Sequence, residues 1–392
     1  MKICAKCVLP ATCPGISFDS NGTCNVCHDF DEEWGGFKHS TIQRKKELNK
    51  IINSFKNKGK KYDCLVPISG GLDSTYVLYV CSRFYNLRTL AFNFNNGFQS
   101  EIARRNLTNA TRKLSVDFVS TGPDWEKASK LYALFFRKTG EFCTPCNLGI
   151  WSFSYKIAQD FGIPLVVSGS SNRISERLPR GNRIYSWSPY YFKEVIRGEM
   201  SIRDAEEYLH LQGDFHNGTL RKISQHFLPT RKINILPIFD YIGWDINLML
   251  KTLKDELNWK QEADRFHHID CTMESVNDYL RQRKWGFSAA AWYSMLVRNE
   301  QISRDKALEL TLKEEEQNLR EPHELELWLE MLNLSREDLK GFEKRSQSHY
   351  IPTQDRIRNA TDRVLGDMVS HLPHRARARF TLRRYRLNSL SK

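Results

Sequence analysis

The chain has 392 residues, of which 40% are hydrophobic and 12% aromatic, so it has apolar material for one sizeable core and one or two smaller units. No apolar run approaches the ~18 residues of a membrane-spanning helix, and the short, polar start at residues 1–9 is unlike a signal peptide. We therefore expect a cytoplasmic protein without membrane contact. The net charge of +13 favours polyanions such as ATP or RNA, and fits a simply basic enzyme equally well.

Residues 1–35 are predicted to form a pair of zinc-binding knuckles. Ten cysteines in a cytoplasmic chain indicate metal binding or catalysis rather than disulfides. Two C-x-x-C turns here each place two thiolates on one tight turn, which completes a tetrahedral four-sulfur site for Zn²⁺. Too few apolar residues surround them for a core, so the metal supplies folding energy. Free thiols or an iron–sulfur cluster are the alternatives. The four ligands are Cys4, Cys7, Cys24 and Cys27.

Residues 36–60 are predicted to be a charged helical linker, and residues 61–245 alternate between strands and helices. The alternation implies an α/β fold in which a parallel sheet carries helices on both faces. The expected strands cover 64–68, 87–94, 116–120 and 164–168, and the expected helices cover 100–114, 124–139 and 151–161.

The first strand of this region runs into the sequence SGGLDS and a helix that opens near Asp73. Two glycines let the backbone approach a ligand closely. The serine hydroxyls and the free N–H groups at the helix start can hold phosphate oxygens, and Asp73 can hold a Mg²⁺ that bridges them. An ordinary strand–turn–helix is the alternative, and the missing Gly-Lys-Ser/Thr ending disfavours a Walker loop. The loop residues are Ser69, Gly70, Gly71, Asp73 and Ser74.

This run resembles the pyrophosphate loop (PP-loop) of the ATP pyrophosphatase superfamily, which includes N-type amidotransferases and tRNA thiolation enzymes. The resemblance implies an adenine nucleotide alpha hydrolase-like domain. It also implies that ATP adenylylates a substrate oxygen with loss of pyrophosphate, after which ammonia or a sulfur species displaces AMP. In that superfamily the end of the second strand lies beside the adenine, which implies nucleotide contacts at Phe92 and Asn95.

Polar, glycine-bearing turns end three of the expected strands: SGGLDS, NFNNG and SGSSN. In open parallel sheets, ligands bind beyond the carboxyl ends of the strands. We therefore expect the three turns to converge, and we place Gly169 of the SGSSN turn in the nucleotide site.

The order of motifs is similar to that of the N-acetyl sugar amidotransferase family, which acts on bacterial surface sugars. The similarity rests on CxxCVLP…PGI.FD..G.CN.C, on VPISGGLDS and SGSSN, and on Trp259, His268 and residues 294–304. It covers roughly residues 1–310. It implies ammonia supplied by a separate glutaminase, and we recognise no glutaminase domain in the chain.

A second C-x-x-C, at Cys143 and Cys146, departs from that family and resembles the sulfur-inserting enzymes of the tRNA thiolation group. Those enzymes add a distant third cysteine, and three thiolates hold a [4Fe-4S] cluster whose fourth iron stays open for sulfur. By this resemblance Cys271 is the third ligand, and the three cysteines are catalytic together with Asp73. Persulfide chemistry on Cys143 or Cys146, a second zinc site and inert thiols are the alternatives.

Two further polar segments are candidates for substrate contact. Arg173, Arg177 or Arg180 meets a phosphate or the adenylate, or is solvated loop charge. His267 and His268, beside Asp270, orient substrate or relay protons, or form a polar turn.

The remainder is predicted to be helical. Residues 246–320 form a substrate or cluster region, and residues 321–392 form an extension. Within the extension, the acidic, leucine-rich stretch 321–339 suits a helix hairpin or the face of a homo-oligomer. The basic tail, 375–392, binds RNA, lies between subunits or is solvated.

Our first hypothesis from sequence is ATP-dependent thiolation, C=O to C=S, of a nucleobase-like substrate, free or in RNA, with sulfur from a donor protein. The PP-loop enzyme of 6-thioguanine biosynthesis is one small-molecule case. Amidine formation on an N-acetyl sugar with glutaminase-derived ammonia is the second hypothesis. An RNA-binding protein with a vestigial nucleotide site is the third.

Overall fold

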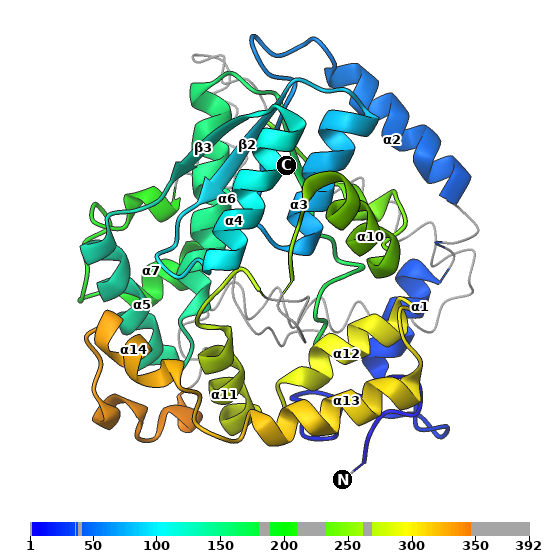
Figure 1. Cartoon of the computed structure of the whole chain (residues 1–392). Helices are drawn as coiled ribbons and strands as arrows, with labels where there is room; N and C mark the ends of the chain where they lie inside the picture. The colour runs from blue at the N-terminus through cyan, green and yellow to red at the C-terminus, as the bar shows by residue number, and fades with distance from the viewer. Residues whose placement is uncertain are drawn as a thin grey trace, which may run out of the picture.

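The predicted α/β fold is confirmed by a computed structural model, which describes residues 2–35, 37, 41–179, 189–209, 233–261 and 269–345. Its sheet has five strands in the order β3-β2-β1-β4-β5, and every neighbouring pair is parallel. Figure 1 shows β2 and β3 side by side. The first strand, β1, lies in the middle of the sheet, with β2 and β3 on one side of it and β4 and β5 on the other. The carboxyl end of β1 is therefore the switch point, where such sheets bind ligands. The strands are β1 Cys64–Pro67, β2 Thr89–Phe94, β3 Asp117–Thr121, β4 Leu165–Ser168 and β5 Asn234–Pro237.

Burial explains why most strands were predictable. Every residue of β2 and β4 is buried, as expected for strands covered on both faces. Strand β3 lies at the sheet edge and is largely exposed, with Phe118 41% accessible. The fifth strand, β5, was not predicted, because the four residues NILP are too short to show a period.

The two faces of the sheet carry separate apolar cores. Cys64 and Val66 of β1 pack with α3, α4 and α10, whereas Leu65 packs with α5, α6 and α7. This division follows from the alternation of side chains along a strand. The helices are α1 Asn25–Trp34, α2 Thr41–Phe55, α3 Leu72–Tyr79, α4 Glu101–Leu114, α5 Trp125–Thr139, α6 Cys143–Asp160, α7 Pro189–Ile196, α10 Ile246–Leu257, α11 Glu274–Trp285, α12 Ala289–Arg298, α13 Arg304–Gln317 and α14 Glu324–Met331.

Short helical segments complete the described chain. A π-helical turn extends α3, and 3₁₀ turns precede α10 and follow α14. None of the described helices is long and apolar enough to cross a membrane. The segments are η2 Val80–Phe84, η3 Glu206–Leu209, η4 Ile238–Asp240, η5 Arg336–Leu339 and η6 Phe342–Lys344.

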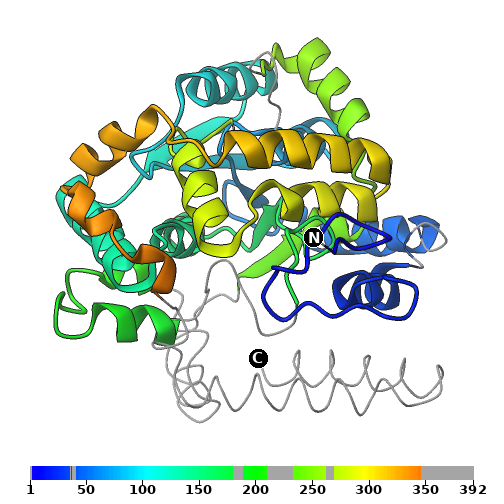
Figure 2. The same cartoon turned by 90° about the horizontal axis from the view of Figure 1, so that it is seen from below.

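Two groups of carboxyl-terminal helices extend the core. Helices α11 and α14 pack against α5 around Trp328, and the amino-terminal cysteine segment lies against α12 and α13 (Figures 1 and 2). Ser303 caps α13, since its hydroxyl accepts from the Lys306 amide at 3.2 Å.

The second C-x-x-C lies on the first turn of α6 rather than on a loop before it, so the predicted start of this helix near residue 151 was wrong. Pro145 made the segment look like a loop, but proline is tolerated in the first helical turn, where its missing N–H costs nothing. Glu141 stabilises this start, because its Oε2 accepts from the Thr144 amide at 3.0 Å.

Candidate functional site

The SGGLDS turn between β1 and α3 is a tight loop held by its own serines. The Ser69 amide donates to Ser74 Oγ at 3.1 Å, and the two hydroxyls lie 3.1 Å apart. Gly70 has φ +91°, and a Cβ there would lie 2.3 Å from the Ala103 carbonyl oxygen, so only glycine fits. Gly71 begins α3 without a side-chain cap. The N–H groups of the first turn are therefore suited to an anion.

Asp73 lies on the first turn of α3, beside the turn that follows β4. Its Oδ1 accepts from Trp244 Nε1 at 2.8 Å. A Cβ on Gly169 would lie 3.4 Å from the Asp73 Cβ, so these two turns are in contact. The third turn joins them through Gln99, whose Nε2 donates to the Ser69 carbonyl at 3.1 Å. The predicted convergence is present, and a carboxylate beside serine hydroxyls is an oxygen donor set that suits Mg²⁺.

A cavity of about 310 Å³ lies at the ends of β2 and β3, at the small end of the range for ligand pockets. It reaches the SGGLDS loop through Gln99, which lines the cavity and bonds the Ser69 carbonyl. Asn95 lines it, as the nucleotide prediction requires. The Phe92 side chain is fully buried in the core of the other sheet face. Asn93 and Asn95 fall in the stretch 92–95 expected beside the nucleotide, and the rest of the lining was not predicted from the sequence. The lining residues are Asn93, Asn95, Gly97, Gln99, Arg104, Leu107, Thr108, Phe118 and Ser120.

The structure brings Cys143, Cys146 and Cys271 into one half-buried cluster. Cys146 Sγ accepts from Asn96 Nδ2 at 3.3 Å, and Cys143 Sγ donates to an Asn277 oxygen at 3.7 Å. Cys271 pairs with Gln99 in an antiparallel bridge, and Gln99 bonds the Ser69 carbonyl, which places Cys271 beside the SGGLDS loop. All three contact the apolar cluster around Phe98 and Phe142.

These three thiols do not form a compact single-ion site. Among the described residues, the only group of three or more candidate ligands with atoms all within 4.8 Å of one another is the amino-terminal four. A zinc ion needs thiolates at about 2.3 Å from the metal, hence close together. A [4Fe-4S] cluster binds each thiolate to a different iron and so tolerates wider spacing.

Burial raises the pKa of each of these thiols. Burial raises the pKa of the Cys146 thiol to about 11, although the hydrogen bond from Asn96 acts in the opposite direction and lowers the pKa. For Cys143 and Cys271, the nearby Glu274 carboxylate adds to the effect of burial. The thiols are therefore protonated at neutral pH, which disfavours a free persulfide carrier, whereas a bound metal would displace their protons.

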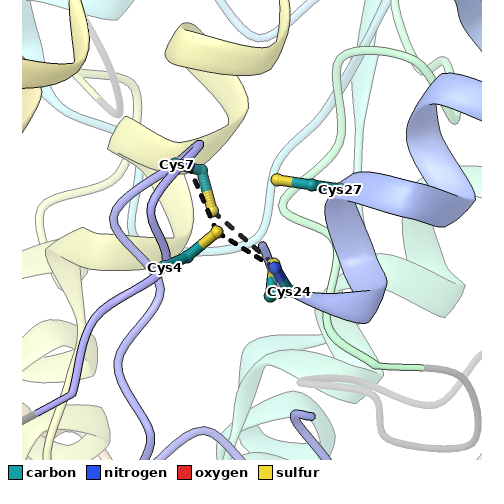
Figure 3. A group of neighbouring side chains, drawn as sticks. All are labelled: Cys4, Cys7, Cys24 and Cys27. Atoms are coloured by element: carbon teal, nitrogen blue, oxygen red, sulfur yellow. Dashed lines mark hydrogen bonds between the residues drawn. The ribbon is translucent and has the colours of Figure 1, made fainter. Parts of the chain in front are cut away.

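The amino-terminal cysteines form the compact site predicted from their spacing (Figure 3). All four are fully buried, and the sulfurs of Cys7 and Cys24 lie 3.8 Å apart. Cys4 Sγ accepts from three amides, those of Lys6, Cys7 and Cys24, at 3.2 to 3.4 Å. Hydrogen bonds from Cys24 and then Cys27 lower the pKa of Cys7 to about 6. Four sulfurs with amide donors fit structural Zn²⁺.

The knuckles dock on α12 and α13 through their backbone. The Val8 amide donates to Ser294 Oγ at 3.1 Å. Arg304 Nε donates to the carbonyls of Cys4 and Cys7 at 3.1 Å. Arg298 is 7% exposed and lies near Cys7, so two cations face what would be an anionic metal centre.

The arginines proposed for phosphate contact have structural roles where the structure describes them. Arg173 is 6% exposed, donates to the Phe239 carbonyl at 3.0 Å and stacks on Phe37. Arg177 pairs with Glu33 at 2.8 Å. Arg173, one of the three candidates for phosphate contact, is therefore buried and bonded to the protein, which fits neither that role nor the alternative of solvated loop charge. Arg180, His267, His268 and the basic tail lie outside the described residues.

Comparisons with known proteins find a family model that matches part of the chain, a distant curated relative and a similar solved structure. Residues 260–363 match the model for the C-terminal domain of LPS biosynthesis protein WbpG-like proteins. The uncharacterized protein MJ1599 of Methanocaldococcus jannaschii is 25% identical over 161 residues, or 40% of this chain. The match spans 57% of that relative's length.

A solved structure, the U34-tRNA thiolase NcsA of Methanococcus maripaludis with its [4Fe-4S] cluster, is 13% identical. The structural match covers 83% of this chain and 91% of the thiolase chain, with a TM-score of 0.34. That score is too low to support an argument about function. The family match includes Asp270 and Cys271, which lie beside the phosphate loop.

Proposed function

We propose that the protein is an ATP-dependent enzyme that adenylylates a carbonyl oxygen of its substrate and replaces that oxygen with nitrogen. The observation that carries the first half is the SGGLDS loop at the switch point of the sheet, which Gln99 links to the 310 Å³ cavity. The cavity takes the nucleoside, and the loop amides with Ser69 and Ser74 take the phosphates. Asp73 would hold Mg²⁺, which would supply positive charge against the leaving pyrophosphate when bound.

In the first step, the substrate carbonyl oxygen attacks the α-phosphorus of ATP. The new O–P bond forms as the bond to the bridging oxygen breaks, and pyrophosphate leaves. Nitrogen of ammonia then attacks the activated carbon, the C–O bond breaks, and AMP departs with the substrate oxygen. Loss of protons from the added nitrogen leaves an amidine. The chain's part is to position the reactants and bind the developing charge.

The proposed acceptor is an N-acetyl sugar, whose acetamido group offers a suitable carbonyl. The match of residues 260–363 to an LPS biosynthesis family supports this choice, as does the order of motifs along residues 1–310. Ammonia would come from a separate glutaminase. The family segment also supplies Asp270 and Cys271 to the border of the loop.

Thiolation is the second candidate, and the cluster of Cys143, Cys146 and Cys271 favours it. Three thiols beside an ATP site have no evident part in amidation. They would hold a [4Fe-4S] cluster, which supplies an iron that binds sulfur when the cluster is present. A nucleobase-like carbonyl would then be the acceptor.

A heavy-oxygen label in the substrate carbonyl tests the shared first step. The protein is incubated with ATP, Mg²⁺ and labelled N-acetyl sugar nucleotides plus ammonium, or with labelled nucleobases plus sulfide under anaerobic conditions. The proposal expects the label in AMP and nitrogen in the sugar product. Label in AMP with a sulfur-containing product selects thiolation instead. AMP release that persists in Asp73→Asn would contradict the assignment of the loop.

A further inference from the structure

Two buried tryptophans contact the phosphate loop at its two ends. Trp244 and Trp259 are 4% and 2% exposed. Trp244 Nε1 donates to Asp73 Oδ1 at 2.8 Å, and Trp259 Nε1 donates to the Gly70 carbonyl at 3.0 Å. A buried indole N–H needs a partner, and here both partners belong to the loop.

Helix α10 sets the places of both tryptophans. Its N-cap is Asp245, whose side chain accepts from the Leu248 amide at 2.9 Å, and its C-cap is Asn258 in the left-handed conformation. Trp244 therefore stands immediately before the helix and Trp259 immediately after it. Buried residues of α10 share one core with α3, the helix that carries Asp73. The contacts to the loop are thus fixed by a rigid element.

The Gly70 carbonyl is held by a second donor as well as by Trp259. Asn106 Nδ2 donates to it at 3.2 Å, while Asn106 Oδ1 accepts from the Lys260 amide at 2.8 Å. A planar peptide whose oxygen is held by two donors cannot turn freely. The bonds to Gly70 thereby also set the direction of the Gly71 N–H, which belongs to the same peptide and donates to Ser69 Oγ at 3.3 Å, a hydroxyl of the proposed phosphate site.

The Trp244 bond orients the Asp73 carboxylate without neutralising it. An arginine or lysine at the same place would compete with a cation for the carboxylate. An indole N–H is a neutral donor, so this bond orients the carboxylate and brings no positive charge to it.

We propose that Trp244 and Trp259 are positioning residues for Mg²⁺–ATP, with Trp244 aiming Asp73 at the metal and Trp259 fixing the Gly70 peptide for the phosphates. This inference rests on the proposed use of ATP. It predicts that the two tryptophans act differently: Trp244 governs the metal-dependent part of nucleotide binding, and Trp259 governs the part that does not need metal.

Calorimetric titration with ATP, with and without Mg²⁺, tests the proposal on Trp244→Phe and Trp259→Phe. Phenylalanine keeps an aromatic ring and removes the N–H. We expect Trp244→Phe to weaken Mg²⁺–ATP binding about tenfold and to leave metal-free ATP binding unchanged. Trp259→Phe should weaken both about equally. Trp328→Phe is the matched control, because Trp328 is fully buried and its Nε1 has no partner among the described residues.

The outcomes separate this inference from the proposed function. If the wild type binds no ATP, both are overturned. If the wild type binds ATP and both variants bind like Trp328→Phe, the positioning role alone is overturned. A second measurement needs no tryptophan variant: the indole N–H resonance that moves in Asp73→Asn should also move when Mg²⁺–ATP binds the wild type. An indole spectrum unchanged in both cases would refute the role of Trp244.

Discussion

Arg304 offers a test of how the knuckle pair is held on the helices. Its guanidinium bonds the carbonyls of Cys4 and Cys7 in three contacts of 2.8 to 3.1 Å. A hydrogen bond from a charged donor is worth about 1.5–3 kcal/mol. Because the Arg304 side chain is half-buried, water can replace some of the hydrogen bonds to the two carbonyls that Arg304→Gln removes. We expect a cost of about 2–3 kcal/mol, or about 30- to 150-fold in the equilibrium between docked and undocked knuckles.

Zinc release to an excess of a chromophoric chelator measures this equilibrium, since the chelator reaches the metal only after the knuckles open. Arg304→Gln should release zinc at least about 30-fold faster than the wild type. Lys306→Gln on the same helix is the control, because its ion pair with Glu309 is more than half exposed and worth little. Equal release rates in all three proteins would refute the docking role of Arg304.

Three other predictions concern stability and iron. Burial raises the pKa of Asp63, but its bonds to Arg88 outweigh this and lower the pKa below the usual value. Its stabilisation is therefore present above pH ~4 and lost as pH falls through the lowered pKa, so Asp63→Asn should flatten acid denaturation curves. Gly149→Ala should lower the free energy of unfolding by about 1–3 kcal/mol, since its Cβ would lie 2.3 Å from Phe94; Phe94→Leu should restore stability. The thiolation candidate predicts that anaerobically purified Cys271→Ser loses iron and keeps zinc, and iron unchanged by this substitution would contradict the cluster.

The features predicted best are those specified over a few neighbouring residues. The SGGLDS loop, the paired C-x-x-C turns and the buried strands β1, β2 and β4 are each encoded by local spacing or apolar runs. Local conformation gives such motifs most of their geometry: Gly70 requires its positive φ, and two thiols on one turn are close in any fold.

Features that depend on long-range packing were missed. Nothing in the sequence near Asp73 indicates a bond to Trp244, and nothing near Cys4 indicates Arg304. Arg173 was a candidate phosphate ligand because the sequence gives its charge but not its burial. Its partners include the Phe239 carbonyl, which lies just after β5, and β5 is a strand too short to predict.

The connection between β2 and α4, residues 95–99, joins the two halves of the candidate site. Its alternate residues face opposite ways: Gln99 lines the cavity, whereas Asn96 donates to Cys146. Gln99 also pairs with Cys271 and bonds the Ser69 carbonyl. The cavity and the cysteine cluster are therefore separated by a single segment of chain. A nucleotide that shifts this segment changes the surroundings of the cysteines, so a cofactor held there should report ATP binding even when no acceptor is present.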